Sequence, residues 1–243
     1  MIIVNADDLG RSPTETDAAL ACYKEGRITS VSAMVFMEDS ARASELAKEA
    51  GIDVGLHINL TQRFSGQVRD RSLGDYHDRV AGFLTVHKYA SLIYNPALRR
   101  PLRYVYQAQV DEFIRLYGKA PSHLDGHQHQ HLCVNMLIDS VIPEGAKVRR
   151  NFHFWPGEKG LLNRTYRRLV DRRLASRYRL TDFFFALSQC LRGDRMTRVV
   201  ELARTTTVEI MTHPVNATEH SYLMSDSYAS AIDGLKKGTY SNL

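Results

Sequence analysis

The sequence predicts an α/β fold with a parallel sheet. Short apolar runs alternate with longer stretches of helical periodicity, and this alternation is typical of βαβ units. Four of the apolar runs end in aspartate or histidine, so residues able to carry chemistry lie where strands are expected to finish. No internal repeat, low-complexity stretch or Pro/Gly/Ser linker divides the 243 residues. We therefore expect a single domain over residues 1–243.

The expected elements follow one another from the amino terminus, with local signals at their ends. Ser12 is a candidate N-cap for the first helix, and Gly26 is its stop signal. Gly51 and Gly118 end two later helical stretches in the same way. The predicted strands are Ile2–Asn5, Ser30–Phe36, Asp53–Leu60, Ser122–Asp125, Lys147–Arg149 and Thr207–Thr212, and the predicted helices are Pro13–Glu25, Ser40–Ala50, Leu102–Tyr117, Leu132–Val141 and Ser227–Lys237.

Two stretches depart from this alternation. Residues 62–101 form a long connection of mixed charge with a weak helical pattern. Connections of this length are usually functional, so we predict a lid or an insertion here. Such a segment can also form an oligomer contact, so a homodimer is an alternative. Leu161 to Leu180 predicts a helix with an arginine-rich face. That face could meet a phosphate, an acidic glycan or, peripherally, a membrane, although a solvated face is the commoner meaning of the pattern.

Composition narrows the class of protein. The net charge of +5 is modest and no motif supports nucleic-acid binding, so we expect no nucleic-acid partner. Cys22, Cys133 and Cys190 are far apart and show no CxxC spacing, which favours a reducing compartment. The amino terminus has no signal-peptide pattern, and no apolar run approaches the roughly 20 residues of a transmembrane segment. We expect a cytoplasmic location.

The segment HLDGHQHQH, residues 123–131, has a histidine or an aspartate at every odd position. If the segment is extended, these side chains project to one face, because side chains alternate along a strand. If a turn intervenes at Gly126, His123 and His127 can still approach each other. Either geometry concentrates imidazole groups, and packing rarely demands four histidines within nine residues.

Candidate site residues lie in or just after the carboxyl-terminal parts of four predicted strands: Asp7 with Asp8, His57, Asp125 with His127, and His213. The carboxyl ends of parallel strands converge on one face, so these side chains are expected to share a pocket. Taken singly, His57 or His213 would more often be a satisfied core or rim histidine. Helix capping explains Asp7 and Asp8 poorly, because the next helix is expected to begin only near Ser12.

Carboxylates and imidazoles together form a ligand set for a divalent cation. Neutral histidine nitrogens and an aspartate oxygen suit Zn²⁺, Mn²⁺, Co²⁺ or Ni²⁺, and Mg²⁺ stays open although it prefers oxygen. Three protein ligands with open positions are typical of catalytic sites. Such a metal activates water and polarises a carbonyl, as amide hydrolysis requires. A second carboxylate can then take a proton from water, and a histidine can give one to the leaving amine.

These motifs resemble the YdjC-like carbohydrate deacetylases, which include chitooligosaccharide deacetylases and the hopanoid-associated HpnK group. The resemblance rests on VNADDLG (4–10) with the helix and strand that follow it, GLHINLT (55–61), PSHLDGHQHQH (121–131) and EIMTHP (209–214). They occur in the family's order and spacing. The resemblance covers most of the chain and is weakest over 62–101 and beyond about residue 215.

The resemblance implies a distorted, TIM-like (β/α) barrel related to polysaccharide deacetylases, with one divalent metal, Mg²⁺ or Zn²⁺. It implies that Asp8, His57 and His127 are the metal ligands, that Asp7 is the general base and that His213 is the proton donor. The implied enzyme is a hydrolase of a linear amide C–N bond. It would remove the N-acetyl group from an N-acetylhexosamine unit of an oligosaccharide or glycoconjugate and release acetate.

The histidine-rich segment leaves finer points open. Asp125 and His123 are expected to orient His127, since ligating imidazoles usually donate their other N–H group to a partner. His129 and His131 receive no chemical role. The chitooligosaccharide branch favours HLDSHHHVH at this segment, whereas this chain has HLDGHQHQH. A glycolipid or a surface-polysaccharide precursor is therefore an alternative substrate.

Two other interpretations remain at this stage. A metal-dependent phosphoesterase on a similar barrel would usually gather two or three metals, and so need more ligands than these strand ends supply. A non-catalytic carbohydrate-binding relative would not need Asp7 beside the ligands. The number of metal ions per chain distinguishes a phosphoesterase from a deacetylase. The activity of an Asp7→Asn variant distinguishes a non-catalytic relative from a deacetylase.

Overall fold

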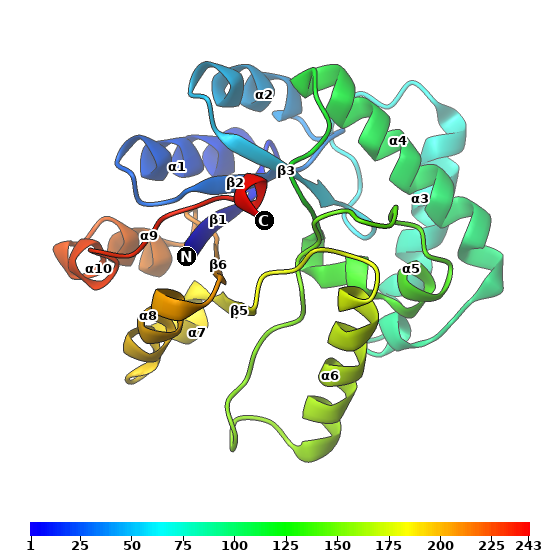
Figure 1. Ribbon diagram of the computed structural model, residues 1–243. Coiled ribbons are helices and arrows are strands. Elements are labelled where there is room, and N and C mark those ends of the chain that lie inside the picture. Colours follow the sequence, from blue (N-terminus) through cyan, green and yellow to red (C-terminus); the bar gives the residue numbers. More distant parts are fainter.

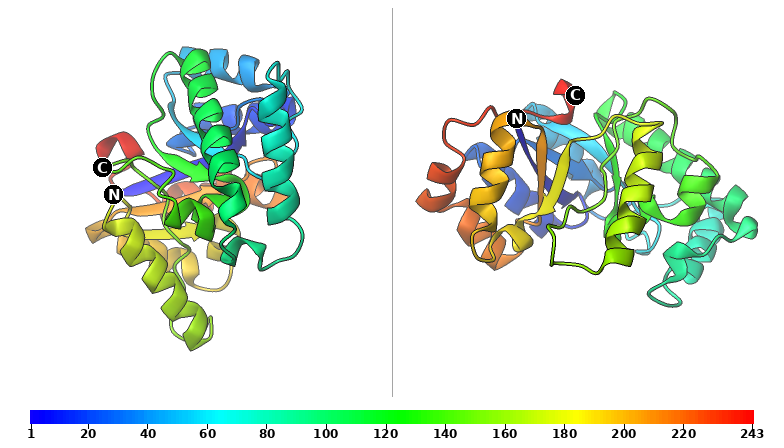
Figure 2. Two further views of the ribbon diagram at one scale, coloured as in Figure 1. Left: turned by 90° about the vertical axis from the view of Figure 1, so that its right-hand side faces the viewer. Right: turned by 60° about the horizontal axis from the view of Figure 1, so that its bottom comes forward.

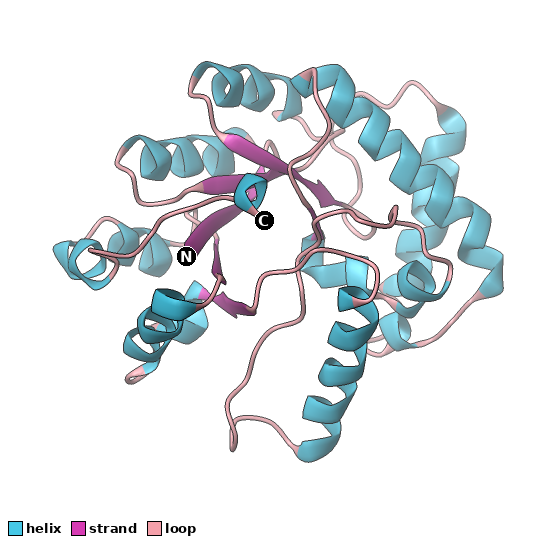
Figure 3. Ribbon diagram, in the orientation of Figure 1, coloured by secondary structure: helices cyan, strands magenta, loops and turns pink.

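In the computed structural model, which describes residues 1–243, six parallel strands form a curled sheet with helices around its outside (Figures 1 and 3). The strand order is β4-β3-β2-β1-β6-β5, so β1 lies inside the sheet, with one half of the chain on each side. All five pairings between neighbouring strands are parallel. The predicted α/β class is confirmed, and the curled sheet agrees with a distorted TIM-like barrel.

The elements have the following bounds. The strands are β1 (Ile2–Leu9), β2 (Ser30–Ala33), β3 (Asp53–Ile58), β4 (Leu124–Gly126), β5 (Phe183–Ala186) and β6 (Val208–Thr212). The helices are α1 (Pro13–Lys24), α2 (Ser40–Glu49), α3 (Arg71–Leu84), α4 (Arg99–Tyr117), α5 (Val134–Ile138), α6 (Leu161–Ala175), α7 (Leu187–Cys190), α8 (Arg195–Thr205), α9 (Ala217–Leu223) and α10 (Asp226–Ala231). Short 3₁₀ turns lie at Ala90–Leu92, Pro96–Leu98, His127–Leu132 and Tyr240–Asn242.

Local sequence explains several of these bounds. All eight residues of β1 are buried, as expected for an inner parallel strand that is covered on both faces. Ser12 caps α1 as predicted, because its side chain accepts a hydrogen bond from the backbone of Thr14. Helix α4 ends at Gly118, whose φ of 70° lies in the left-handed region that glycine adopts without strain.

An irregular segment, residues 147–153, lies between the two edge strands of the sheet. The backbone N–H of Arg149 donates to Leu124 at 3.0 Å, and that of His153 donates to Phe184 at 2.8 Å. The segment therefore contacts both β4 and β5. The predicted strand Lys147–Arg149 exists only as isolated bridges to Leu124 and Arg179.

Some predicted elements differ from the structure. Strand β5 and helix α8 were not predicted, and the predicted helix Ser227–Lys237 is wrong in length, because α10 ends at Ala231. Beyond it the chain turns back to β1, where Gly238 donates to Ile2. Residues 62–101 contain α3, which packs on α4 (Figure 1). The lid role of 62–101 and the single domain over 1–243 stay predictions.

The predicted arginine-rich helix is α6. It projects from the rest of the molecule, which is plainest in the left view of Figure 2. None of the helices combines the length and the apolar character that a membrane span needs.

Candidate metal centre

The end of β1 places two neighbouring aspartates beside the same imidazole. In a regular strand, the side chains of Asp7 and Asp8 would point to opposite faces. Here the pairing of β1 with β2 shifts register between Ala6 and Leu9, and Asp8 has a φ of 67°. A non-glycine residue in that region costs about 1–3 kcal/mol and persists mainly at functional sites. The irregularity brings Asp7 Oδ2 to 4.0 Å and Asp8 Oδ1 to 3.3 Å from opposite nitrogens of His57.

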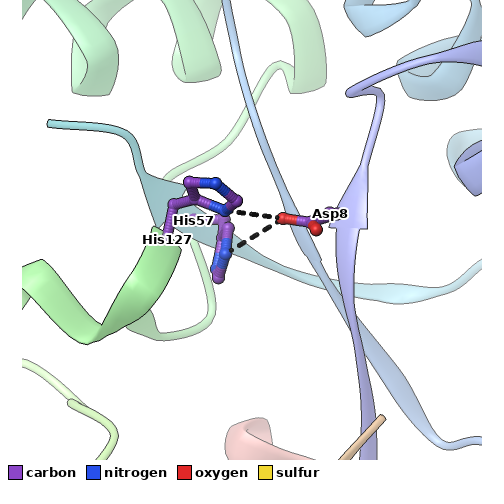
Figure 4. A group of neighbouring side chains, drawn as sticks. All are labelled: Asp8, His57 and His127. Carbon is purple, nitrogen blue, oxygen red and sulfur yellow. Dashed lines mark hydrogen bonds and ion pairs between the residues drawn. The ribbon is translucent and has the colours of Figure 1, made fainter. Parts of the chain in front are cut away.

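Asp8, His57 and His127 form a compact group of potential ligands. Asp8 Oδ1 lies 3.0 Å from His127 Nδ1 and 3.3 Å from His57 Nε2, and Figure 4 shows the carboxylate pointing toward both rings. One donor atom from each residue lies within 4.8 Å of the other two, and all three side chains are buried. Burial opposes the charged form of Asp8, yet His127 and His57 hold its pKa well below the usual range. One carboxylate and two imidazoles in this arrangement fit a divalent cation.

The outer nitrogen of His57 is held by Asp125. His57 Nδ1 donates to Asp125 Oδ1 at 2.8 Å, which leaves Nε2 to face Asp8. Asp125 lies opposite His57 in the pairing of β3 with β4, so it positions His57 and not His127, contrary to our expectation. Burial would lower the pKa of His57, but the carboxylates of Asp125 and Asp7 outweigh it and raise the pKa to about 10. A carboxylate that orients a ligating imidazole in this way is typical of metal sites.

A second cluster of possible ligands, Asp7, His57 and Asp125, has a different character. The buried guanidinium of Arg149 donates to both oxygens of Asp7 at 2.7 Å and lies 2.6 Å from Asp125 Oδ2. His57 offers this cluster only Nδ1, which is already bonded to Asp125. A cation there would have to share both carboxylates with a fixed positive charge. The first cluster is therefore the better metal site.

Arg149 also joins the centre to the carboxyl terminus of the chain. Its Nε donates to Glu209 at 2.8 Å, and the hydroxyl of Tyr240 donates to the other oxygen of Glu209 at 2.5 Å. Burial raises the pKa of Glu209 to about 7 although Arg149 opposes the shift. A single guanidinium thus balances three buried carboxylates, which fixes the orientation of Asp7.

His213 approaches Asp8 from the side away from His57 and His127. Its Nε2 lies 4.0 Å from Asp8 Oδ2, while the two ligand histidines face Oδ1. The side chain is 37% exposed, so it can reach a substrate as well as the centre. Glu219, near the start of α9, accepts hydrogen bonds from the backbone of His213 and from the hydroxyl of Thr212, both at 2.7 Å.

The rest of the histidine-rich segment is structural. The chain is extended only to Gly126, and left-handed conformations at Gln128 and His129 then turn it. His123 contacts Ser32 at 3.0 Å and stacks on Tyr240, and His131 contacts the backbone oxygen of Arg149 at 3.1 Å. Burial lowers the pKa values of His123 and His131 to about 4, so both rings are neutral near pH 7. His129 packs its ring against Phe152.

The structure therefore brings all five predicted site residues into one centre: Asp7, Asp8, His57, His127 and His213. Sequence reasoning missed Arg149, Glu209 and Glu219. Arg149 and Glu209 could have been noticed because each is a charged residue inside a predicted strand. A charged side chain is buried in a strand only when partners balance its charge. Glu219 carried no signal of its own.

Comparison with protein-family models identifies the family of this chain. The family model described as YdjC-like protein matches residues 1–238. The chain belongs to the YdjC-like family. The resemblance seen in the sequence motifs is therefore confirmed.

Relatives of this YdjC-like chain carry deacetylase names. The carbohydrate deacetylase of Mus musculus is 28% identical, over 88% of this chain and 77% of the relative. The carbohydrate deacetylase of Clostridium beijerinckii is 26% identical, over 94% of this chain and 86% of the relative. A chitooligosaccharide deacetylase of Salmonella schwarzengrund is 30% identical, over 54% of this chain and 50% of the relative.

A solved structure shares the fold of the YdjC-like chain. A putative cellobiose-phosphate cleavage protein from Enterococcus faecalis superposes with a TM-score of 0.70, over 99% of this chain and 97% of the other. The sequence identity is 17%, so the likeness concerns the fold alone.

Proposed function

We propose that this protein is a carbohydrate N-deacetylase that uses one divalent metal. The observation that carries the proposal is the convergence of Asp8, His57 and His127, with Asp7 and His213 on separate sides of the group. The deacetylase names of the relatives support the same reaction class. The reaction would hydrolyse the acetamide of an N-acetylhexosamine unit to acetate and a free amine.

Asp8, His57 and His127 would hold the metal. A divalent metal supplies Lewis-acid chemistry, activating water and polarising the amide carbonyl. Two imidazoles favour Zn²⁺ over Mg²⁺, which prefers oxygen ligands. The hydrogen bond from His57 to Asp125 supports this role, because it fixes the ring with Nε2 toward the site.

Asp7 is the proposed general base. Its Oδ1 accepts from Asn5 at 2.9 Å and from Arg149, whereas Oδ2 accepts from Arg149 alone. A carboxylate oxygen has two lone pairs, so Oδ2 keeps one to accept a proton from water. Oδ2 is also the oxygen nearer His57. Arg149 orients the carboxylate for that transfer and does not itself move a proton.

His213 is the proposed acid for the leaving amine. Its ring is the exposed one among the site histidines and reaches Asp8 from the side opposite the ligand rings. Glu219 holds its backbone at the end of β6, so the ring has a fixed starting point. Protonation of the nitrogen as the C–N bond breaks is the step that amide hydrolysis needs from such a group.

A phosphoesterase is the nearest alternative activity. Such sites usually gather two or three metals. The second carboxylate cluster of this chain is neutralised by Arg149, which works against a second cation. The geometry therefore supports the deacetylase better. We also propose a cytoplasmic location, because cysteines without a disulfide are typical of reducing compartments.

The test is an acetate-release screen over N-acetylated oligosaccharides, nucleotide sugars and glycolipids. Each substrate is assayed with metal-loaded protein, after thorough chelation, and after Zn²⁺ or Mg²⁺ is restored. We expect release of acetate that chelation removes and the metal restores, at one metal ion per chain. Activity that survives chelation, or a stoichiometry of two or three ions, would contradict the proposal.

A further inference from the structure

Tyr240 lies buried inside the barrel, although it belongs to a short turn beside the start of β1. Gly238 donates to Ile2 at 2.9 Å and so holds the preceding segment against β1, and Figure 1 shows the turn near that end of the strand. The side chain of Tyr240 has no exposed surface. A buried tyrosine hydroxyl needs a hydrogen-bond partner, and here the partner is the buried carboxylate of Glu209. A buried charge is costly, so this choice of partner calls for an explanation.

Successive hydrogen bonds connect the hydroxyl of Tyr240 to the proposed base. The hydroxyl donates to Glu209 Oε2 at 2.5 Å, and Glu209 Oε1 accepts from Arg149 Nε at 2.8 Å. The two terminal nitrogens of Arg149 donate to the two oxygens of Asp7 at 2.7 Å each. All four side chains are buried. Because bulk water does not reach them, each group is held in place by its neighbours in this network.

Arg149 is held on both sides of the edge that binds Asp7. Glu209 Oε1 lies 2.8 Å from Nε and 2.8 Å from Nη2 of Arg149, and Asp125 Oδ2 lies 2.6 Å from Nη1. Asp7 occupies the edge between them, formed by Nη1 and Nη2. A guanidinium is planar, and its donors form a rigid fork. Glu209 and Asp125 therefore fix the plane in which Asp7 is held.

Glu209 binds Arg149 strongly only as a carboxylate, because hydrogen bonds between charged groups are the strong ones. Burial raises the pKa of Glu209 to about 7, while Arg149 and the hydroxyl of Tyr240 act in the opposite direction. The hydroxyl donates to the oxygen that Arg149 leaves free, and so favours the charged form. Without the hydroxyl, Oε2 would be buried with no partner and would take up a proton more readily.

We propose that Tyr240 is a positioning residue for Asp7 and acts through Glu209 and Arg149. The hydroxyl of Tyr240 keeps Glu209 charged and in place, and Glu209 in turn fixes one side of Arg149. Arg149 then presents the carboxylate of Asp7 to the site. This inference rests on the proposed function, because Asp7 is a base only in that reaction. Tyr240 contacts none of the three proposed metal ligands, so its influence on the centre is indirect.

The aromatic ring of Tyr240 supports the metal ligands by a different path. It stacks on His123 with ring centroids 4.0 Å apart, and His123 contacts the hydroxyl of Ser32 at 3.0 Å. Ser32 donates to Asp125 Oδ2 at 2.8 Å, and Asp125 accepts from the ligand His57. The ring thus supports a metal ligand, whereas the hydroxyl supports the base. A variant that loses only the hydroxyl separates the two paths.

Tyr240→Phe is that variant, because it keeps the ring that stacks on His123. We expect kcat for acetate release to fall about 10- to 100-fold, the usual effect of losing a partner that orients a group at a metal centre. KM should not change, because no contact with the substrate is removed. Metal affinity, measured by calorimetry, should also stay the same. Glu209→Gln keeps the shape of the side chain but not its charge, and should lower kcat in the same way.

Tyr228→Phe is the matched control. The hydroxyl of Tyr228 is also buried and donates to the backbone oxygen of Arg27 at 2.7 Å, away from the network around Arg149. This variant should keep both kcat and KM. Circular dichroism gives the melting temperature of each variant, and the kinetics are compared well below the lowest of them. An unchanged kcat in Tyr240→Phe, an equal fall in Tyr228→Phe, or a raised KM with an unchanged kcat would overturn the proposal.

A crystal structure of Tyr240→Phe tests the positioning of Asp7 without turnover. We expect the bond from Arg149 to Glu209 to be lost and the paired bonds from Arg149 to Asp7 to be displaced, while His57 keeps its bond to Asp125. Arg149 and Asp7 in unchanged positions would overturn the inference. If the unchanged protein releases no acetate from any substrate, the proposed function fails, and this structure still decides whether Tyr240 positions Asp7.

Discussion

The variant Asp7→Asn tests whether Asp7 acts as the general base or as a ligand of the metal. The substitution keeps the size of the side chain but replaces one carboxylate oxygen with an NH₂ group, which can only donate. Both oxygens of Asp7 accept from Arg149 at 2.7 Å, so one of these bonds becomes a contact between two donors. A hydrogen bond to a charged group contributes about 1.5–3 kcal/mol. Arg149 keeps Asp125 at 2.6 Å and Glu209 at 2.8 Å, so the loss should stop near that range.

The variant should therefore fold, since domains have about 5–15 kcal/mol of stability to lose. Without a base, kcat for acetate release should fall about 10²- to 10⁴-fold, which corresponds to roughly 3–5 kcal/mol in the barrier. Metal affinity, measured by calorimetry, should stay within about tenfold, because Asp7 is not among the three ligands. Asp17→Asn, at an exposed surface pair, is the control and should change neither quantity.

Two results would refute this reasoning. Full turnover by Asp7→Asn would show that the carboxylate does not accept the proton. A large loss of metal affinity that matches the loss of turnover would show that Asp7 belongs to the metal site and not beside it. A folded variant that binds metal and barely turns over is the outcome we expect.

Three further predictions follow from the same contacts. Asp125→Asn weakens the bond that fixes His57, and calorimetry should show metal affinity about 10- to 100-fold lower, whereas unchanged affinity would mean that the contact is incidental. Burial lowers and the carboxylates of Asp125 and Asp7 raise the pKa of His57, to about 10 in the metal-free protein, so metal must displace a proton from it. Calorimetry in buffers of different ionisation enthalpy should therefore show release of about one proton, with affinity rising about tenfold per pH unit between roughly pH 7 and 9; proton uptake is the contrary result. In Gly55→Ala the new Cβ would lie 2.3 Å from the His123 ring, so denaturant unfolding should show a loss of about 1–3 kcal/mol, unlike Gly74→Ala, where the Cβ meets nothing within 4 Å.

The sequence was informative wherever chemistry follows an apolar run. His57 lies near the end of β3 and His127 comes directly after β4, two strands that the apolar pattern reveals, and parallel pairing aligns the ends of those strands. The same rule brings in Asp8 and His213 from β1 and β6. These positions could be predicted because they depend on the order of elements and not on side-chain packing.

Contacts that depend on register or on distant partners could not be predicted. Asp125 binds His57 because the two are paired across β3 and β4, and no local pattern specifies that register. Arg149 is buried only because carboxylates far away in the sequence balance its charge. Strand β5 reads FFFA, a run too short and too uniform to be distinguished from a buried helical segment by periodicity.

The most direct test of the metal centre is a crystal structure of the metal-loaded protein with anomalous diffraction data. We predict one anomalous peak per chain, about 2.0–2.2 Å from Asp8 Oδ1, His57 Nε2 and His127 Nδ1 for a Zn²⁺ ion. His57 Nδ1 should still be bonded to Asp125 in that structure. A peak between Asp7 and Asp125, or a second peak of equal height, would contradict the account.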